Sequence, residues 1–217
     1  MRDEAPPERP QSVGEEIANS ISHGVGALLA AAAAPILIVH AVRHGGAINV
    51  VGATVFAATL LTLYLGSTVY HSLPRGKAKN VFQLLEHAAI FLLIAGTYTP
   101  FALGVLRGPW GWTLLAVIWT LAAAGIGLKL IGGAEGFPAI STLLYLFMGW
   151  VVIAAIRPLW LHMPHLGLVW LVAGGLAYTV GVPFFIAERV PYAHFVWHLF
   201  VLTGSTFHFF AAWQYAV

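Results

Sequence analysis

Cysteine is absent from this sequence of 217 residues, and charged residues are scarce, at 8% of the total. Without cysteine the chain has no disulfide bond, no thiolate metal ligand and no cysteine nucleophile. Soluble domains carry roughly 25% charged residues, so the composition excludes an ordinary water-soluble domain. The net charge is only +2, and no basic cluster indicates nucleic acid as a partner.

Long apolar stretches rich in Ala, Leu and Val stand in place of the missing charge, and 59% of the residues are hydrophobic. A transmembrane β-barrel would instead show short alternating strands. A helix needs about 20 apolar residues to cross the hydrocarbon core of a bilayer. We therefore predict an all-α polytopic membrane protein, a seven-transmembrane helix bundle, with spans at Ile21–Val42, Ile48–Ser72, Val81–Val105, Gly111–Ile131, Ala139–Leu161, Leu166–Ala187 and Tyr192–Trp213.

The start of the chain is polar and rich in proline, and it lacks the basic segment and short apolar core of a signal peptide. We expect residues 1–11 to form a disordered cytoplasmic tail and residues 12–217 to form a single seven-transmembrane domain. The segment Ser12-Val-Gly-Glu15 fits a capping box, which predicts that a helix begins there.

Basic residues are divided unevenly between the two sides of the predicted bundle. With a cytoplasmic N-terminus, seven of the ten Lys and Arg residues fall on the inner side and three on the outer side. The loop that carries Arg75, Lys77 and Lys79 contributes most of the difference. Positive charge is enriched on the cytoplasmic side of membrane proteins. This pattern predicts a cytoplasmic N-terminus and, after seven spans, a C-terminus outside.

Three histidines and one glutamate lie inside predicted spans, where ionisable residues are rare and usually paired or functional. His71 closes the second span, Glu86 lies near the start of the third, and His194 and His198 open the seventh. In the predicted topology all four lie near the cytoplasmic face, so residues far apart in the sequence share one depth. The spacing of His194 and His198 places two imidazoles on one helix face, about 5–6 Å apart at Cβ.

This combination of side chains predicts a metal site with zinc as its cofactor. Catalytic zinc sites typically use three protein ligands and a water, and we assign the ligands as His71, His194 and His198. Glu86 is the candidate general base. Ser67, four residues before His71, can orient the water or stabilise a developing oxyanion. Iron, cobalt or nickel would accept the same ligands.

Three polar residues of the first span, Glu16, Asn19 and His23, share one helix face. We predict that they contact the metal ligands from outside the site, and an ordinary polar stripe at the membrane interface is the alternative. A pair of Glu86 with Lys79 or Arg75 is the alternative to a role at the metal.

Three further histidines are assigned no part in the site. His87 follows Glu86 on a different face of its helix and is predicted to pack against a neighbouring helix. His40 and His208 lie in the outer half of their spans. At about 1.5 Å per residue, His208 is about 15 Å from His198 along the helix.

Several sequence segments of this chain are typical of a known family. The chain resembles the hemolysin III family of bacterial membrane proteins, within the superfamily of adiponectin/progestin receptors and alkaline ceramidases. The matching segments run through nearly the whole chain in order: Glu16-Ile-Ala-Asn-Ser-Ile-Ser-His23, Gly66-Ser-Thr-Val-Tyr-His71, Glu86-His-Ala-Ala-Ile-Phe-Leu-Leu-Ile-Ala-Gly-Thr-Tyr-Thr-Pro100, His194-Phe-Val-Trp-His198 and Ser205-Thr-Phe-His208.

The resemblance implies seven helices, a cytoplasmic N-terminus, a multi-pass location in the bacterial inner (plasma) membrane, and zinc near the cytoplasmic face. It implies the same ligands, His71, His194 and His198, with Ser67 and an acid beside the ion. The family usually has Asp where this chain has Glu86. The side chain of Glu86 is longer by one methylene group, which shifts its carboxylate. This shift affects its expected role as general base more than it affects metal binding.

Four functions remain open at this point. The first is a zinc-dependent hydrolase that cleaves an amide or ester of a membrane lipid. The second is a sensor or receptor in which zinc is structural. The third is a membrane-active hemolysin that causes cytolysis, and the fourth is a proton path along His194, His198, Ser205 and His208.

Overall fold

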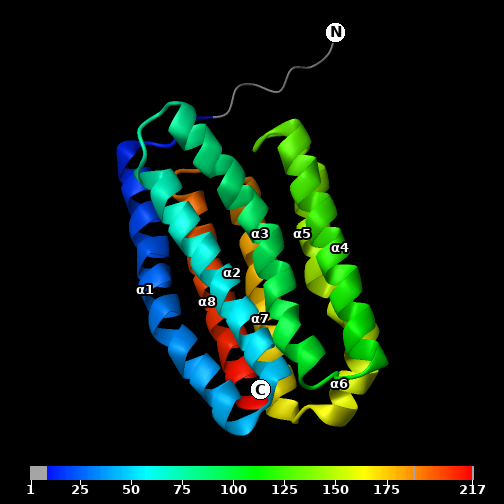
Figure 1. Ribbon diagram of the computed structural model, residues 1–217. Helices are drawn as coiled ribbons and strands as arrows, with labels where there is room; N and C mark the ends of the chain where they lie inside the picture. The colour runs from blue at the N-terminus through cyan, green and yellow to red at the C-terminus, as the bar shows by residue number, and fades with distance from the viewer. Residues whose placement is uncertain (1–8, 188, 217) are drawn as a thin grey trace.

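The computed structural model describes residues 9–187 and 189–216, and these ranges contain helices and no strand. Seven segments are long and apolar enough to cross a membrane. They lie side by side as a bundle (Figure 1), which confirms the predicted seven-span helical fold. Their bounds are α1 Val13–His44, α2 Ala47–Ser72, α3 Lys77–Leu103, α4 Pro109–Gly132, the fifth span Pro138–His162, α7 His165–Ile186 and α8 Ala193–Tyr215.

Helix α1 begins eight residues before the predicted first span, at Val13 rather than Ile21. The predicted capping box is confirmed: the Glu15 backbone N–H donates to Ser12 Oγ at 3.3 Å, and the Ser12 N–H donates to Glu15 Oε2 at 2.9 Å. Glu15 also accepts hydrogen bonds from Arg9 and from the backbone N–H of Tyr192. These contacts hold the start of α1 beside the start of α8.

The predicted disordered tail, residues 1–11, falls mostly outside the described residues. Two of the described residues in this segment contact α1. The Arg9 guanidinium donates to Glu15 Oε2 at 3.0 Å, and Gln11 Oε1 accepts a hydrogen bond from Asn19 Nδ2 at 2.6 Å.

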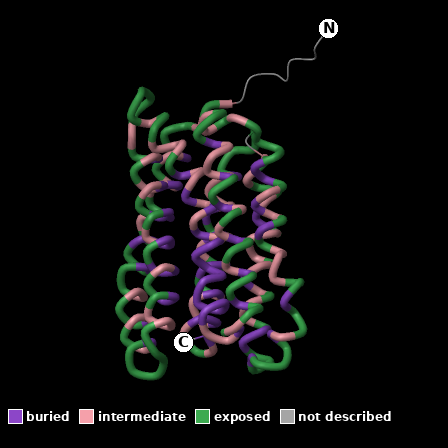
Figure 2. The backbone as a smooth tube through the Cα atoms, turned by 45° about the vertical axis from the view of Figure 1, so that its right-hand side comes forward, coloured by how far each residue is buried: buried purple, intermediate pink, exposed green. Residues whose placement is uncertain are grey.

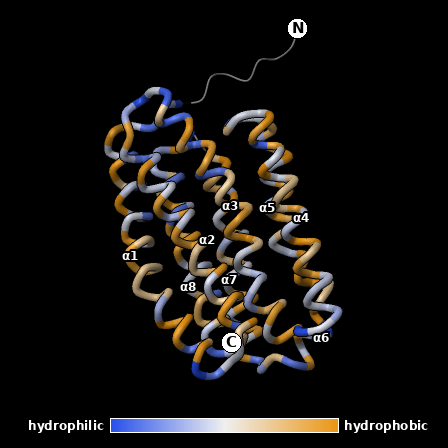
Figure 3. Tube along the Cα trace, in the orientation of Figure 1, coloured by the Kyte–Doolittle hydropathy of each residue, from blue (hydrophilic) through white to orange (hydrophobic). Residues whose placement is uncertain are grey.

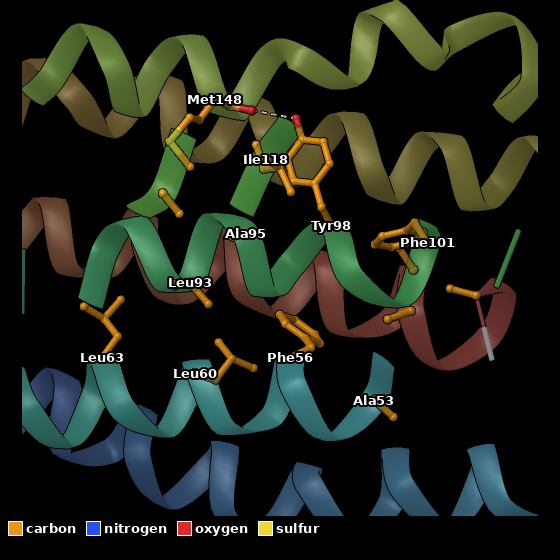
Figure 4. Close-up of a cluster of buried hydrophobic side chains, with 14 of the residues drawn as sticks. Ala53, Phe56, Leu60, Leu63, Leu93, Ala95, Tyr98, Phe101, Ile118 and Met148 are labelled. Atoms are coloured by element: carbon orange, nitrogen blue, oxygen red, sulfur yellow. Dashed lines mark hydrogen bonds between the residues drawn. The ribbon is translucent and has the colours of Figure 1, made fainter. Parts of the chain in front are cut away.

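The fifth span is interrupted, whereas the sequence analysis predicted one continuous helix over Ala139–Leu161. It consists of α5 (Pro138–Trp150), a 3-10 turn (Val151–Ala155) and α6 (Ile156–His162). The Tyr98 hydroxyl of α3 donates to the Met148 carbonyl at 2.7 Å (Figure 4) and accepts the N–H of Val152 at 2.9 Å. A neighbouring side chain therefore satisfies the backbone groups that the tighter turn leaves without a partner.

Apolar side chains fill the centre of the bundle and also cover its outside. Figure 4 shows Phe56 and Leu60 of α2 meeting Leu93 of α3, and Ile118 of α4 beside Tyr98 on the other side of α3. Buried positions face neighbouring helices (Figure 2), while many large apolar residues are exposed on the outer faces. Hydrophilic residues gather at the ends (Figure 3). Apolar surface on the outside suits contact with lipid rather than water.

Close helix approach depends on small residues at particular points. A Cβ atom at Gly52 of α2 would lie 2.9 Å from the Cα atom of Pro100 in α3. A side chain there would force the two helices apart. Helix α2 packs against α1 and α3, and α8 packs against α1 and α7. These contacts bring the start of α8 and the end of α2 to the same end of the bundle.

The two described ends of the chain lie at opposite ends of the bundle (Figure 1), as an odd number of spans requires. The starts of α1, α3 and α8 and the end of α2 share one end. The cytoplasmic location of that end stays a prediction from the distribution of Lys and Arg.

Candidate metal site

The three histidines and the glutamate singled out in the sequence come together at the end of the bundle where α1 begins. His71 lies in the last turn of α2, Glu86 lies in α3, and His194 and His198 lie in the first two turns of α8. One ligand atom from each of the four lies within 4.8 Å of the other three. His71, Glu86 and His198 are buried, and His194 is partly buried. The group can hold a metal ion.

The ring nitrogens of two histidines are oriented by α1. His71 Nδ1 lies 2.7 Å from Glu16 Oε2, and His198 Nδ1 lies 3.2 Å from the Asn19 carbonyl oxygen. A carboxylate and a carbonyl oxygen only accept hydrogen bonds, so each neutral ring carries its proton on Nδ1 and a lone pair on Nε2. Metal-binding histidines commonly have this arrangement, with the second nitrogen held by an oxygen acceptor.

Buried nitrogen atoms without partners also fit a metal ion. Nε2 of His71 and Nε2 of His194 have no hydrogen-bond partner among the described residues. The nearest acid to the first of them is Glu86, whose Oε1 atom lies 3.6 Å away. A buried polar atom without a partner costs free energy. Borderline divalent ions such as zinc accept imidazole and carboxylate ligands together, so a bound ion would satisfy these atoms.

Lys79 lies outside this group and holds Glu16 in place. Its Nζ atom lies 2.9 Å from Glu16 Oε1 and donates to the carbonyl oxygens of Tyr70 and Leu73 at 3.0 and 3.2 Å. The alternative interpretation, in which Lys79 pairs with Glu86, is therefore wrong. The lysine fixes the carboxylate that in turn orients His71.

Asn19 and His23 of α1 contact the site in different ways. Asn19 contacts His198 through its backbone carbonyl, while its side chain bonds to Gln11. His23 stacks on His198, with ring centroids 3.5 Å apart. Its Nδ1 atom lies 2.7 Å from Oγ of Ser67, which is fully buried. Ser67 therefore meets a histidine of α1 at the edge of the site.

A further contact of the site was not predicted from the sequence. The Ser22 hydroxyl lies 3.0 Å from His198 Nδ1 and donates to the Asn19 carbonyl at 2.8 Å. The signal was present, because Ser22 lies three residues after Asn19 and therefore on the same side of the helix. Helix α1 thus contacts the rings of both His71 and His198.

A cavity runs from Glu86, His194 and His198 into the bundle and has a volume of about 170 Å³. Glu86, His194 and His198 line one end, and Phe101 and Leu159 line the other. The wall between them is mainly apolar. His87, which the sequence analysis placed in a helix contact, also lines the cavity, and its Nδ1 atom bonds to the Gln83 carbonyl. The metal group therefore opens onto a long apolar space.

Comparison with known proteins identifies a family. The family model described as Haemolysin-III related matches residues 11–209. The chain is 51% identical to Hemolysin-3 of Bacillus cereus, over 95% of this chain and 94% of that protein. It is 44% identical to the Hemolysin-3 homolog of Bacillus subtilis (strain 168), over 95% and 96%. Human Monocyte to macrophage differentiation factor is 30% identical, over 75% of this chain and 69% of that protein. The chain therefore belongs to the Haemolysin-III related family of membrane proteins.

Proposed function

We propose that the protein is a zinc-dependent hydrolase that cleaves an amide or ester bond of a membrane lipid. One observation carries the proposal: the group that can hold a metal lies at the end of a long apolar cavity. A lipid chain in that cavity would place its carbonyl group beside Glu86, His194 and His198. The predicted orientation puts the reaction near the cytoplasmic face of the bacterial inner membrane.

Zinc fits the donor set, with His71, His194 and His198 as its ligands. When bound, zinc polarises a carbonyl group and lowers the pKa of a water toward ~7. The surrounding residues then have separate tasks. Glu86 accepts the proton of the attacking water and returns it to the leaving group. Ser67, held by His23, donates a hydrogen bond to the oxyanion that develops on the carbonyl oxygen.

The lining of the cavity matches an extended fatty acyl chain in length. Along α3 its lining extends from Glu86 to Phe101. Fifteen residues at about 1.5 Å each span about 22 Å. Ligand sites combine a largely apolar wall with a few placed polar groups. Here Glu86 and four of the five histidines that line the cavity, His23, His87, His194 and His198, lie at the metal end.

Fatty acid release tests the proposal directly. Zinc-loaded protein in nanodiscs is expected to release free fatty acid from an N-acyl lipid amide or an acyl ester, measured by mass spectrometry. Incubation with a metal chelator is expected to stop the release, and added zinc to restore it. Release that continues unchanged after the metal is removed would contradict the proposal.

Removal of the Glu16 carboxylate is expected to weaken metal binding without abolishing it. The change Glu16→Gln leaves His71 without its charged partner, and loss of such a partner typically costs about 10–100-fold in metal affinity. The neighbouring Glu15→Gln is the matched control, because Glu15 contacts Arg9 and Tyr192 rather than His71. Zinc affinity would be measured by competition with a fluorescent chelator. Equal losses in the two variants would show that α1 acts through stability alone.

A sensor or receptor is the second candidate, and the proximity of Glu86 to the histidines favours it. If Glu86 occupied the fourth position, the site would hold four protein ligands, as structural zinc sites do. The ion would then join α2, α3 and α8 and leave no position for water. The names of the two Bacillus relatives suggest a third role, membrane damage. The cavity gives that role little support, because its wall is mainly apolar and a water-filled pore needs polar groups across the bilayer.

A further inference from the structure

A second group of buried polar side chains lies beside the same cavity, away from the metal site. His208 of α8 lines the cavity and is ten residues beyond His198, or about 15 Å along the helix. The ring of Tyr178 from α7 lies 5.4 Å from the His208 ring, measured between centroids. The hydroxyl groups of Tyr178 and Ser205 lie 2.8 Å apart and form a hydrogen bond with one another.

His208 is left with one free acceptor. Its Nε2 atom lies 3.1 Å from the Leu171 carbonyl oxygen of α7. Because a carbonyl oxygen only accepts hydrogen bonds, Nε2 is the donor, and Nδ1 of the neutral ring is an acceptor. That Nδ1 atom is buried and has no hydrogen-bond partner among the described residues. Such an atom lowers the stability of the folded protein when it stays unpaired.

The backbone of α7 makes room for this ring. A Cβ atom at Gly174 would lie 2.5 Å from Cδ2 and Nε2 of His208. The absence of a side chain at Gly174 lets the imidazole approach α7 closely enough to bond to Leu171. The contact holds the Nε2 edge of the ring against α7, so Nδ1 is the ring nitrogen that remains for a ligand.

A single water is a poor partner for Nδ1. A buried water typically makes about three hydrogen bonds and needs two to four polar partners. The hydroxyl groups of Tyr178 and Ser205 already bond to one another, and the cavity lining includes the apolar residues Leu168, Leu171 and Val201. A donor carried by an apolar ligand fits better, because the ligand fills the remaining space with hydrocarbon.

We propose that His208 recognises a hydroxyl group in the middle of the lipid chain, which donates a hydrogen bond to Nδ1. This inference rests on the proposed function, in which the chain carbonyl lies at the metal end. An extended chain with carbon–carbon bonds of about 1.5 Å advances roughly 1.25 Å per carbon, so 15 Å corresponds to about 12 carbons. The preferred lipid is therefore a long-chain acyl compound hydroxylated near carbon 12.

The test compares three fatty acids of equal length as competitors of a fluorescent fatty acid bound to the zinc-loaded protein. The probes are octadecanoic acid, 12-hydroxyoctadecanoic acid and 3-hydroxyoctadecanoic acid. Wild-type protein is expected to bind the 12-hydroxy acid about five- to tenfold more tightly than either of the others, the gain of one buried hydrogen bond. His208→Phe is expected to bring the ratio to about one while octadecanoic acid still binds.

His40→Phe is the matched control, because it makes the same change at a histidine of α1 that does not line the cavity. It is expected to keep the wild-type preference. His208→Leu repeats the test if the phenylalanine variant does not fold. Equal binding of the three acids by wild-type protein would overturn the role of His208 and leave the hydrolase proposal standing. A preference that survives in the His208 variants would also overturn it. If no acid binds, the lipid cavity itself, and with it the proposed function, is wrong.

Discussion

Replacement of His194 and His198 together by alanine is expected to remove the metal from the protein. Purified wild-type protein should contain about one zinc per chain and the double variant less than about a tenth of that, because two of three predicted ligands are lost. The two rings lie on one face of α8, with centroids 4.7 Å apart. Inductively coupled plasma mass spectrometry on detergent-purified protein measures the metal directly.

The chain contains a matched control for this experiment. His40 and His44 of α1 have the same i, i+4 spacing, and their ring centroids are 4.3 Å apart. They lie at the other end of the bundle. Among the described residues, no acid or third histidine lies close enough to complete a metal site with them. The His40→Ala/His44→Ala variant should keep its zinc. Loss of zinc from both double variants, or from neither, would contradict the site.

Metal loss should also lower stability. The candidate ligands His71, His194 and His198 come from α2 and α8, and two of them are held by α1. An ion that binds only the folded state adds RT ln(1 + [L]/Kd), about 4 kcal/mol at a thousandfold excess over Kd. Zinc added to metal-free wild-type protein should therefore raise the melting temperature. The same addition should leave the His194→Ala/His198→Ala variant almost unchanged.

The features that were predictable from the sequence depend on local patterns or on depth in the membrane. The capping box depends on two residues three positions apart. The grouping of His71, Glu86, His194 and His198 follows from the order of the spans, because alternate spans reverse direction and place the four residues at one depth. Apolar length alone predicts seven helices. None of these steps requires knowledge of which helices touch.

Features that depend on contacts between helices were not predictable. The break in the fifth span at Trp150 depends on the Tyr98 hydroxyl of α3, which satisfies backbone groups about 50 residues away. Lys79 pairs with Glu16 rather than Glu86 because α1 packs against α2 beside the start of α3. The free acceptor of His208 is visible only once Gly174 and Leu171 of α7 lie against its ring. In the sequence, His208 is only a polar residue in the outer half of a span, and neither of these contacts with α7 can be predicted.

The change Glu86→Gln is expected to abolish hydrolysis and leave zinc in place. Glutamine has nearly the same shape as glutamate but cannot take the proton of the attacking water. Loss of a general base typically costs about 100- to 10,000-fold in rate. The measurement is fatty acid release per zinc-loaded chain, so that any difference in metal content is divided out.

Glu86→Asp completes the experiment, because the resemblance to the hemolysin III family implies Asp at this position. The carboxylate is kept but moved by the length of one methylene group. If Glu86 acts as the base, the aspartate variant should retain zinc and hydrolyse at a rate between those of wild-type protein and Glu86→Gln, or above wild-type if the longer side chain is a compromise.

The zinc content of Glu86→Gln separates the two candidate functions. If the variant keeps its zinc but no longer hydrolyses lipid, Glu86 is the base of an enzyme whose fourth metal position is open. Zinc lost together with hydrolysis would make Glu86 a fourth ligand, which closes the site and favours the sensor. Full turnover by Glu86→Gln would leave the reaction without this base, and the proton would then have to pass to another group beside the site. His23 would be the next residue to replace, because it touches both Ser67 and His198 and its Nε2 atom has no hydrogen-bond partner among the described residues.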